Sequence, residues 1–222
     1  MILITGASSG LGAQIAQRYA QQGKSLLLSG RDQQRLQQVK DNCLGKAATH
    51  VTDLAEAKSV STLFDALPQP PELIIHCAGS GYFGPLTEQQ PQQIVALINN
   101  NLLSATLVLQ QAVKRYQDQA VTVVVVMSTA AQVAKAGESS YCAVKWGVRG
   151  LVESLRLELK YKPMKLVAVY PGGMATEFWQ TSGKDIDLSN FMSAAEAAQM
   201  LVDALQHSAR GFVSDITINR TE

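Results

Sequence analysis

Short apolar blocks recur along the chain, and longer segments with a helical spacing of apolar residues separate them. Blocks that are apolar on both faces and rich in Val, Ile and Leu are typical of strands buried in a parallel sheet. The blocks lie near residues 1–5, 25–29, 47–51, 72–76, 120–128, 165–170 and 212–218. Their alternation with helical segments predicts an α/β fold, a doubly wound parallel sheet of about seven strands with helices on both faces.

Local signals mark the start of one helix and the position of one long loop. Ser193-Ala-Ala-Glu196 forms a capping box, which predicts a helix over about 194–208. Two long helical patterns run from Pro91 to Gln117 and from Ser139 to Lys160. The longest stretch without a pattern runs from Glu177 to Met192, and its length predicts a lid or a binding loop.

Composition limits the classes of protein to consider. The 222 residues, 46% of them hydrophobic, suffice for one substantial core, and we expect a single domain over residues 1–222. The net charge is +1 without a basic cluster, which argues against nucleic acid or an anionic membrane as a partner. No apolar run reaches the ~20 residues that span a bilayer. Because the chain starts directly on a strand pattern, we expect no signal peptide and a cytoplasmic protein.

Cysteines and histidines give no sign of a metal site. Cys43, Cys77 and Cys142 are widely spaced and odd in number, which favours reduced thiols over disulfides or bound zinc. The histidines at positions 50, 76 and 207 lack the spacing of metal ligands. We therefore expect a protein without a metal ion.

A glycine-rich turn follows the first strand pattern. Met1 to Thr5 runs into Gly6-Ala-Ser-Ser-Gly10-Leu-Gly12, and a helical pattern begins directly afterwards. Glycines permit a tight turn and close backbone approach, while a helix start presents unpaired N–H groups to a phosphate. This arrangement predicts a phosphate-binding loop, although glycine-rich turns also occur for purely conformational reasons.

Three residues in the middle of the chain carry groups suited to proton transfer. Tyr141 and Lys145 lie four positions apart, hence on one face of any helix that carries them. Ser128 ends a strand pattern, at the edge where ligands bind in open α/β sheets. Taken singly, a Tyr and Lys at this spacing are typical of a surface pair, and a Ser that closes a strand is typical of a turn.

Taken together, these segments resemble the short-chain dehydrogenase/reductase family, in its single-domain branch. The matching motifs are Thr5-Gly-x-x-x-Gly10-x-Gly12, Ser128, Tyr141-x-x-x-Lys145 and Pro171-Gly172. They occur in the family's order and spacing over nearly the whole chain, and they imply a Rossmann-like fold. One segment departs from the pattern, because His76-Cys77-Ala78-Gly79 stands where the family commonly has Asn-Asn-Ala-Gly. His76 is either a structural residue at a strand end or a catalytic base.

The resemblance implies a nicotinamide dinucleotide cofactor. The residues that would bind it are Gly6, Ser8, Ser9, Gly10, Leu11, Gly12, Arg31, Asp53, Ala78, Gly79, Tyr141, Lys145, Pro171, Gly172 and Thr176. The family's NAD-selecting carboxylate would fall at Gly30, and the following Arg31 resembles a residue that selects the 2′-phosphate, so NADP(H) is expected in preference to NAD(H). Asp32 either caps the next helix or reaches the ribose, and Asp53 either contacts adenine or belongs to a turn.

The resemblance also implies the roles of four catalytic residues. Tyr141 would be the acid and base, Ser128 would hold the substrate oxygen, Lys145 would hold the nicotinamide ribose, and Asn101 would orient a water. The neighbouring asparagines leave the last assignment uncertain by one position. A lysine ~5 Å from a phenol favours the phenolate by roughly 3 kcal/mol at an effective dielectric of ~20, so we expect Lys145 to lower the Tyr141 pKa.

The implied activity is hydride transfer between NADP(H) and a small or medium carbonyl or alcohol substrate, and two alternatives remain. One is an NAD(P)-binding redox sensor without turnover; the other is a nucleotide-sugar epimerase, disfavoured because no substrate domain follows the sheet. The two long helical patterns resemble the family's subunit interfaces and suggest a homodimer or homotetramer. Five residues are either pocket wall or ordinary packing, namely Tyr82, Phe83, Met174, Phe178 and Trp179.

Overall fold

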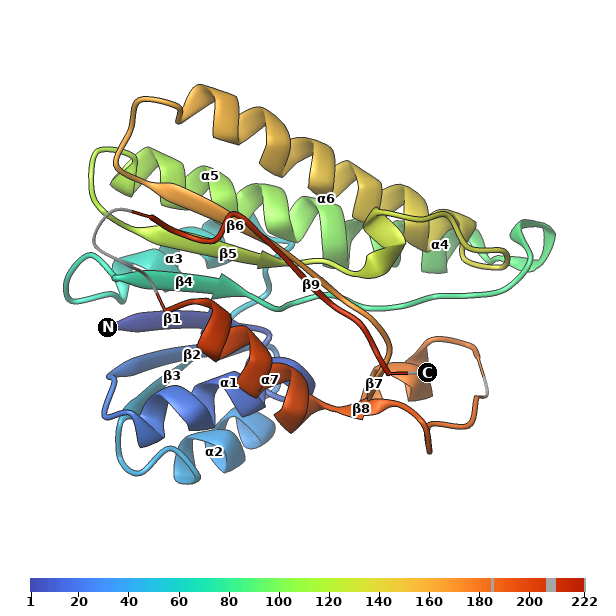
Figure 1. The fold of residues 1–222 in the computed structure, drawn as a ribbon, viewed down its shortest axis with the longest axis horizontal. Helices are drawn as coiled ribbons and strands as arrows, with labels where there is room; N and C mark the ends of the chain where they lie inside the picture. Colours follow the sequence, from blue (N-terminus) through green and yellow to red (C-terminus); the bar gives the residue numbers. More distant parts are fainter. Residues whose placement is uncertain (185, 207–210, 222) are drawn as a thin grey trace.

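A parallel sheet forms the centre of the molecule (Figure 1). The computed structural model describes residues 1–184, 186–206 and 211–221. Within these residues seven strands pair in the order β3-β2-β1-β4-β5-β6-β9, all parallel. Their bounds are β1 Ile2–Thr5, β2 Leu26–Gly30, β3 Ala47–Val51, β4 Leu73–His76, β5 Thr122–Val126, β6 Lys165–Pro171 and β9 Asp215–Ile218. The predicted fold class is confirmed.

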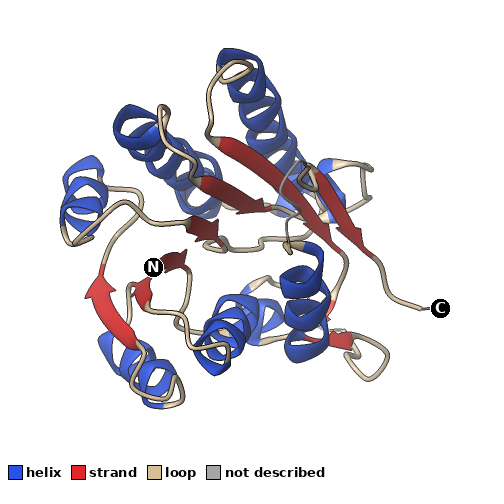
Figure 2. Ribbon diagram, turned by 60° about the vertical axis from the view of Figure 1, so that its left-hand side comes forward, coloured by secondary structure: helices blue, strands red, loops and turns tan. Residues whose placement is uncertain are grey.

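Helices cover both faces of this sheet (Figure 2). One face carries α1 Gly10–Gln21, α2 Gln33–Asp41 and α7 Ala194–Ala204. The other carries α3 Ala57–Asp65, α4 Pro91–Ile98, α5 Ser104–Tyr116 and α6 Ser139–Glu158. The inner strands β1, β2, β4, β5 and β6 are buried almost throughout because each side packs against one of these helical layers, whereas the edge strands β3 and β9 also have exposed positions.

The strand order reverses between β1 and β4. From β1 the chain builds outward through β2 and β3, and β4 then returns to the other side of β1. The helices that follow these two strands, α1 and α4, therefore lie on opposite faces of the sheet and leave a crevice at the strands' carboxyl ends, where ligands bind in folds of this kind. Thr5 and His76, the last residues of the two strands, are register partners and meet at this point.

Short elements lie around the carboxyl edge of the sheet. They are the 3₁₀ turns η1 Leu86–Glu88, η3 Thr129–Ala131 and η4 Glu177–Thr181, and the two-residue strands β7 Met174–Ala175 and β8 Met192–Ser193. The predicted unpatterned loop thus begins with a 3₁₀ turn, and its far end pairs with the segment just before it. The loop is therefore anchored at both ends rather than irregular throughout.

Several predicted helices and strands are present, but their boundaries differ from the prediction. The Ser193 and Glu196 capping box is present, although α7 ends at Ala204, and residues 207 and 208 of the predicted helix lie outside the described residues. β9 starts at Asp215, three residues later than the predicted strand near 212–218. The predicted helix from Pro91 to Gln117 is interrupted by a π-helical segment, η2 Asn99–Leu103. Such segments are often found at functional sites.

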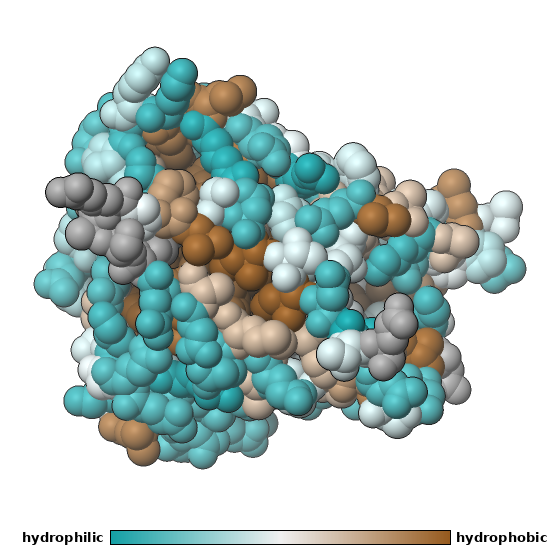
Figure 3. Space-filling model, in the orientation of Figure 1, coloured by the Kyte–Doolittle hydropathy of each residue, from teal (hydrophilic) through white to brown (hydrophobic). Residues whose placement is uncertain are grey.

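Apolar side chains also reach the surface. Figure 3 shows them gathered in the middle of the face on which Figure 1 places α7 and β9. Met200 of α7 is 44% exposed, and Phe212 and Val213 just before β9 are 44% and 39% exposed.

None of the helices in the described part of the chain has the length and apolar character needed to cross a membrane.

Candidate active site

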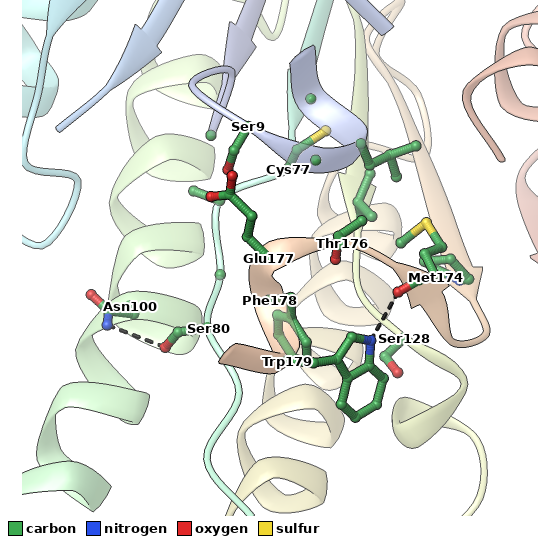
Figure 4. Close-up of a pocket in the computed structure, with 18 of the residues that line it drawn as sticks. Ser9, Cys77, Ser80, Asn100, Ser128, Met174, Thr176, Glu177, Phe178 and Trp179 are labelled. Atoms are coloured by element: carbon green, nitrogen blue, oxygen red, sulfur yellow. Dashed lines mark hydrogen bonds between the residues drawn. The ribbon is translucent and has the colours of Figure 1, made fainter. Parts of the chain in front are cut away.

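Close backbone contacts shape the glycine-rich turn after β1. Gly6 has φ +66°, and a Cβ there would lie 2.5 Å from the backbone nitrogen of Ala78. A Cβ on Gly12 would lie 2.4 Å from the carbonyl oxygen of Gly6. The turn after β1 and the segment after β4 thus lie directly against each other at Gly6. Because of these close contacts, only glycine fits at either position. Ser9 stands at the N-cap of α1 without using its side chain to cap the helix, and it lies along the crevice (Figure 4).

His76 stands at the position where the resemblance implies an asparagine, and it makes a polar contact of its own. Its Nδ1 lies 2.9 Å from the Thr5 hydroxyl, which joins the ends of β1 and β4. Burial, together with the charge of Lys145, lowers the pKa of His76 to about 3, so the imidazole is neutral. His76 is 2% exposed and does not line the cavity described below. These contacts support the structural role for His76 over the catalytic one.

The three residues with proton-transfer groups come together at the carboxyl edge of the sheet. Tyr141 and Lys145 lie one turn apart on α6, and the Lys145 Nζ is 5.6 Å from the centre of the Tyr141 ring. Ser128 precedes η3, where its hydroxyl accepts a hydrogen bond from the Ala130 N–H at 3.1 Å and also hydrogen-bonds Tyr141. Tyr141 is 6% exposed and Lys145 is 5% exposed. The surface-pair interpretation of Tyr141 and Lys145 is therefore wrong.

Burial sets the protonation of these groups. It raises the pKa of Tyr141, while the hydrogen bond from Ser128 lowers this pKa and the charge of Glu138 raises it further. Burial lowers the pKa of Lys145 to about 8, against an opposing effect of Cys77. The expected lowering of the Tyr141 pKa by Lys145 is not found: burial raises this pKa, and the group that lowers it is Ser128, not Lys145. At neutral pH Tyr141 carries its proton.

Asn101 lies behind the cavity wall rather than on it. It belongs to η2, and its Nδ2 donates to the carbonyl oxygens of Ser80 at 3.0 Å and Leu97 at 2.9 Å. Its Oδ1 is buried and has no hydrogen-bond partner among the described residues. A Cβ on Gly79 would lie 2.8 Å from this oxygen and 3.2 Å from the Lys145 Nζ. The neighbouring Asn100 is the one that lines the cavity.

Two arginines lie near the end of β2. Arg31 is exposed, and its Nη1 lies 3.4 Å from Asn100 Oδ1. Asp32 accepts a hydrogen bond from the Arg35 N–H at 3.0 Å and so caps α2, as one of the two interpretations held. Arg35, which the sequence analysis missed, lines the same cavity and pairs with Glu177 at 2.5 Å. Its position in the first turn of α2, four residues after Arg31, was the available signal. Asp53 lines the cavity and accepts a turn hydrogen bond from the Ala55 N–H.

Aromatic rings close the other end of the cavity. Phe83 packs edge to face with Tyr141 at 5.1 Å between ring centres and lies 5.6 Å from Trp179. Phe178 and Phe191 extend this group, each 5.4 Å from Trp179. Of the five residues left open by the sequence, Phe83, Met174, Phe178 and Trp179 line the cavity. Figure 4 shows the last three of them. Tyr82 does not, and its hydroxyl accepts a hydrogen bond from the Gln90 N–H.

One cavity of about 660 Å³ connects the glycine turn, the buried Tyr141 and the aromatic end. Every predicted cofactor-binding residue lines it, namely Gly6, Ser8, Ser9, Gly10, Leu11, Gly12, Arg31, Asp53, Ala78, Gly79, Tyr141, Lys145, Pro171, Gly172 and Thr176. Its volume lies in the usual range for small-molecule and cofactor sites. Residues from six strand ends and from α6 thus face a single space.

Known proteins are similar to this chain in sequence and in fold. The family model for short chain dehydrogenases matches residues 1–187. The chain belongs to the short-chain dehydrogenase family. A curated relative, the hydroxysteroid 11-beta-dehydrogenase 1-like protein A of Xenopus laevis, is 30% identical over 187 residues, which are 79% of this chain and 64% of that protein. The chain therefore spans just under two thirds of that relative's length.

Solved structures of the short-chain dehydrogenase family superpose on the chain. A short-chain dehydrogenase/reductase from Vibrio parahaemolyticus is 55% identical, with a TM-score of 0.93 over 100% of both chains. Another, from Sphingobium yanoikuyae in complex with NADPH, is 27% identical, with a TM-score of 0.84 over 96% of this chain and 86% of that one. The second comparison shows that a related fold accommodates a nicotinamide dinucleotide.

The short-chain dehydrogenase described here has the features that such a dinucleotide requires. The contact between Gly6 and Ala78 keeps side chains away from the crevice, and the amino end of α1 faces it with Ser9 uncommitted. Gly79 lies close to the Lys145 ammonium and to the buried Asn101 Oδ1, which has no hydrogen-bond partner in the part of the chain that the structure describes. Cys77, in place of the family's second asparagine, lines the cavity as a half-buried thiol whose pKa burial raises to about 12. It is uncharged and does not oppose an anionic ligand.

Proposed function

We propose that this short-chain dehydrogenase is an NADP(H)-dependent oxidoreductase acting on a small or medium carbonyl or alcohol substrate, with Tyr141 as the acid and base. The observation that carries the proposal is the meeting of Ser128, Tyr141 and Lys145 at the head of one cavity, with all the predicted cofactor residues along its length. The NADPH complex of the Sphingobium yanoikuyae relative supports the choice of cofactor class.

In the reducing direction Tyr141 donates its proton to the substrate oxygen. Burial keeps the phenol protonated at neutral pH, which suits a general acid. Ser128 shares a hydrogen bond with the Tyr141 hydroxyl and would hold the same substrate oxygen, so that the oxygen lies between two donors. When bound, the nicotinamide supplies the hydride, or accepts it in the reverse direction.

Lys145 and Asn101 would supply the proton that Tyr141 needs after each transfer. The Lys145 Nζ and the Asn101 Oδ1 both lie close to Gly79, where Lys145 would hold the nicotinamide ribose and Asn101 would orient a water. An ammonium with a pKa of about 8 exchanges protons readily near neutral pH and can replenish the proton that Tyr141 gives away. Asn101 offers its buried oxygen as an acceptor in this path.

Arg31 and Arg35 favour NADP(H) over NAD(H). Gly30 at the end of β2 provides no carboxylate for a ribose diol, and the two arginines beside it lie on the cavity wall. Asp32, the one acid that could take the carboxylate's place, is occupied in capping α2 and lies 3.7 Å from Arg35. A 2′-phosphate would therefore meet two guanidinium groups and no free acid.

The test is consumption of NADPH in the presence of a panel of ketones, aldehydes and β-keto acids, alongside NADPH binding measured by fluorescence. The proposal predicts binding together with turnover of at least one class in the panel. Binding of NADPH without turnover of any compound would instead support a redox sensor.

A further inference from the structure

A buried carboxylate lies at the aromatic end of the cavity, where no catalytic step described above uses it. Glu138 directly precedes α6, three residues before Tyr141, and it lines the cavity. The residue is 6% exposed, and its side chain is 8% exposed. An ionised carboxylate in such a place requires partners, because burial of an unpaired charge is strongly unfavourable.

Glu138 forms a long ion pair with Lys184. The Lys184 Nζ lies 3.4 Å from the Glu138 Oε1, longer than the ~2.7 to 2.9 Å typical of a charge-assisted hydrogen bond. The Lys184 side chain is 44% exposed and belongs to the loop that follows η4. A carboxylate offers about four acceptor sites, and Lys184 uses one of them. Lys184 can turn into water, whereas Glu138 is fixed against the pocket.

The other acids along the cavity are engaged elsewhere. Asp32 caps α2, Asp53 accepts a turn hydrogen bond, and Glu177 pairs with Arg35. Glu138 is thus the carboxylate that, among the described residues, faces the aromatic end next to Tyr141.

Two further cations lie at the aromatic end, and neither is paired with Glu138. Lys135 donates to the Thr129 hydroxyl at 3.2 Å, and the Arg220 guanidinium stacks on Phe191 at 4.3 Å. Both residues are exposed, so water screens their charges more strongly than the buried charge of Glu138. They leave the Glu138 carboxylate available to a ligand.

We propose that Glu138 determines substrate specificity by binding an ammonium group, so that the preferred substrates are amino ketones, amino aldehydes or the corresponding amino alcohols with an apolar or aromatic body. This inference rests on the proposed oxidoreductase function. The ammonium takes the place of Lys184 on the carboxylate, while the apolar body packs among Phe83, Phe178 and Trp179. The ring faces add a further attraction for a cation, as the position of the Lys184 Nζ 5.7 Å from the Phe83 ring centre shows.

The test compares matched ketones that differ only in an ammonium group or a neutral group of similar size. A charge-assisted contact predicts that kcat/KM of the parent protein favours the amino ketone by ~10- to 150-fold. At neutral pH, where Tyr141 is protonated in both proteins, Glu138→Gln should abolish this preference by lowering kcat/KM for the amino ketone far more than for the neutral ketone. Lys184→Met should raise kcat/KM for the amino ketone, because it removes the competing cation. Lys58→Met, at an exposed site on α3, is the matched control and should change neither value.

The opposite signs of the two variants distinguish substrate binding from a simple latch. If Glu138 and Lys184 only held the loop closed, both substitutions would reduce kcat/KM for both ketones alike, and the proposal would be wrong. Equal use of the two ketones by the parent protein would also overturn it.

A binding measurement separates this inference from the proposed function. Trp179 lines the pocket, so its fluorescence in a Trp146→Phe background with NADP⁺ present reports ligand entry. If the protein turned over no carbonyl compound, the oxidoreductase proposal would fail, yet tighter binding of the amino ligand that disappears in Glu138→Gln would still support the Glu138 site. No difference in binding between the charged and neutral ligands would refute it.

Discussion

Arg35 of α2 and Glu177 of η4 form an ion pair, with 2.5 Å between Nη1 and Oε2, across the mouth of the cofactor crevice. Both side chains line the cavity, and Glu177 lies beside Ser9 at the start of α1 (Figure 4). The pair connects the proposed 2′-phosphate site to the first turn of the loop from Glu177 to Met192. Because a dinucleotide bound in this crevice would bring its anionic phosphates to this place, we expect cofactor binding and the position of the loop to be coupled through these two residues.

Glu177→Gln should loosen the loop and strengthen NADPH binding. Loss of an exposed ion pair changes free energies by ~0.2 to 1 kcal/mol, so we expect NADPH to bind up to ~5-fold more tightly and proteases to cut residues 177–192 faster without ligands. In the parent protein, NADPH and substrate together should slow this cleavage, because a closed loop is less accessible to proteases. Closure of this kind excludes water from the reacting groups. Glu56→Gln, exposed at the start of α3, is the control. Cleavage rates that do not respond to ligands would rule out a lid.

Arg31→Ala should reduce the preference for NADPH. A hydrogen bond to a charged group contributes ~1.5 to 3 kcal/mol, so the ratio of kcat/KM for NADPH to that for NADH should fall by roughly 10- to 150-fold with NADH use little changed. Arg31 has no strong contact to lose, since its Nη1 lies 3.4 Å from Asn100. Lys46→Ala removes an exposed positive charge away from the cavity and should leave the ratio unchanged. A parent protein that favours NADH would show that the arginines do not select the cofactor.

Glu138→Gln should also change the dependence of activity on pH. Burial and the Glu138 charge both raise the Tyr141 pKa, so removal of this charge lowers it. Carbonyl reduction requires protonated Tyr141, and the fall of kcat/KM at high pH should therefore move to lower pH in the variant. A neutral ketone is used, so that charge on the substrate does not interfere. Glu158→Gln, at the far end of α6, should keep the parent profile. An unchanged profile in Glu138→Gln would mean that the two groups do not interact.

Self-association should involve the helical face formed by α4 and α6. Val95 and Ile98 of α4 are 56% and 40% exposed, and Trp146 of α6 is 47% exposed. Large apolar side chains that are exposed on neighbouring helices are typical of subunit interfaces. Sedimentation at micromolar concentration should show a dimer or tetramer, and Trp146→Glu should shift it toward smaller species. A parent protein that sediments only as a monomer would exclude the interface.

Strands and helix caps, which depend on residues close together in the sequence, could be predicted from the sequence. The seven strands, the cap by Asp32 and the capping box at Ser193 depend on residues within a few positions of one another, and the structure has all of them. The meeting of Ser128 with Tyr141 and Lys145 was predictable only because several separated motifs matched one family.

The remaining features depend on contacts between distant segments or on burial. Arg35 and Glu177 are separated by 142 positions, and no local pattern relates them. The raised pKa of Tyr141 follows from its burial, which the spacing of Tyr141 and Lys145 does not reveal. The π-helical turn at Asn101 directs this side chain behind the cavity wall, whereas a regular helix was predicted.

The role of Tyr141 is tested most directly by the rate of NADPH-dependent reduction in Tyr141→Phe, measured with a ketone that the parent protein reduces and with NADPH affinity determined in parallel. The substitution deletes the transferable proton and retains the ring that packs on Phe83 and Phe178. Loss of a general acid typically reduces rates by ~10²- to 10⁴-fold. We predict a loss of this size in kcat with NADPH binding essentially unchanged. A variant that binds NADPH and reduces the ketone at near the parent rate would contradict the proposed mechanism.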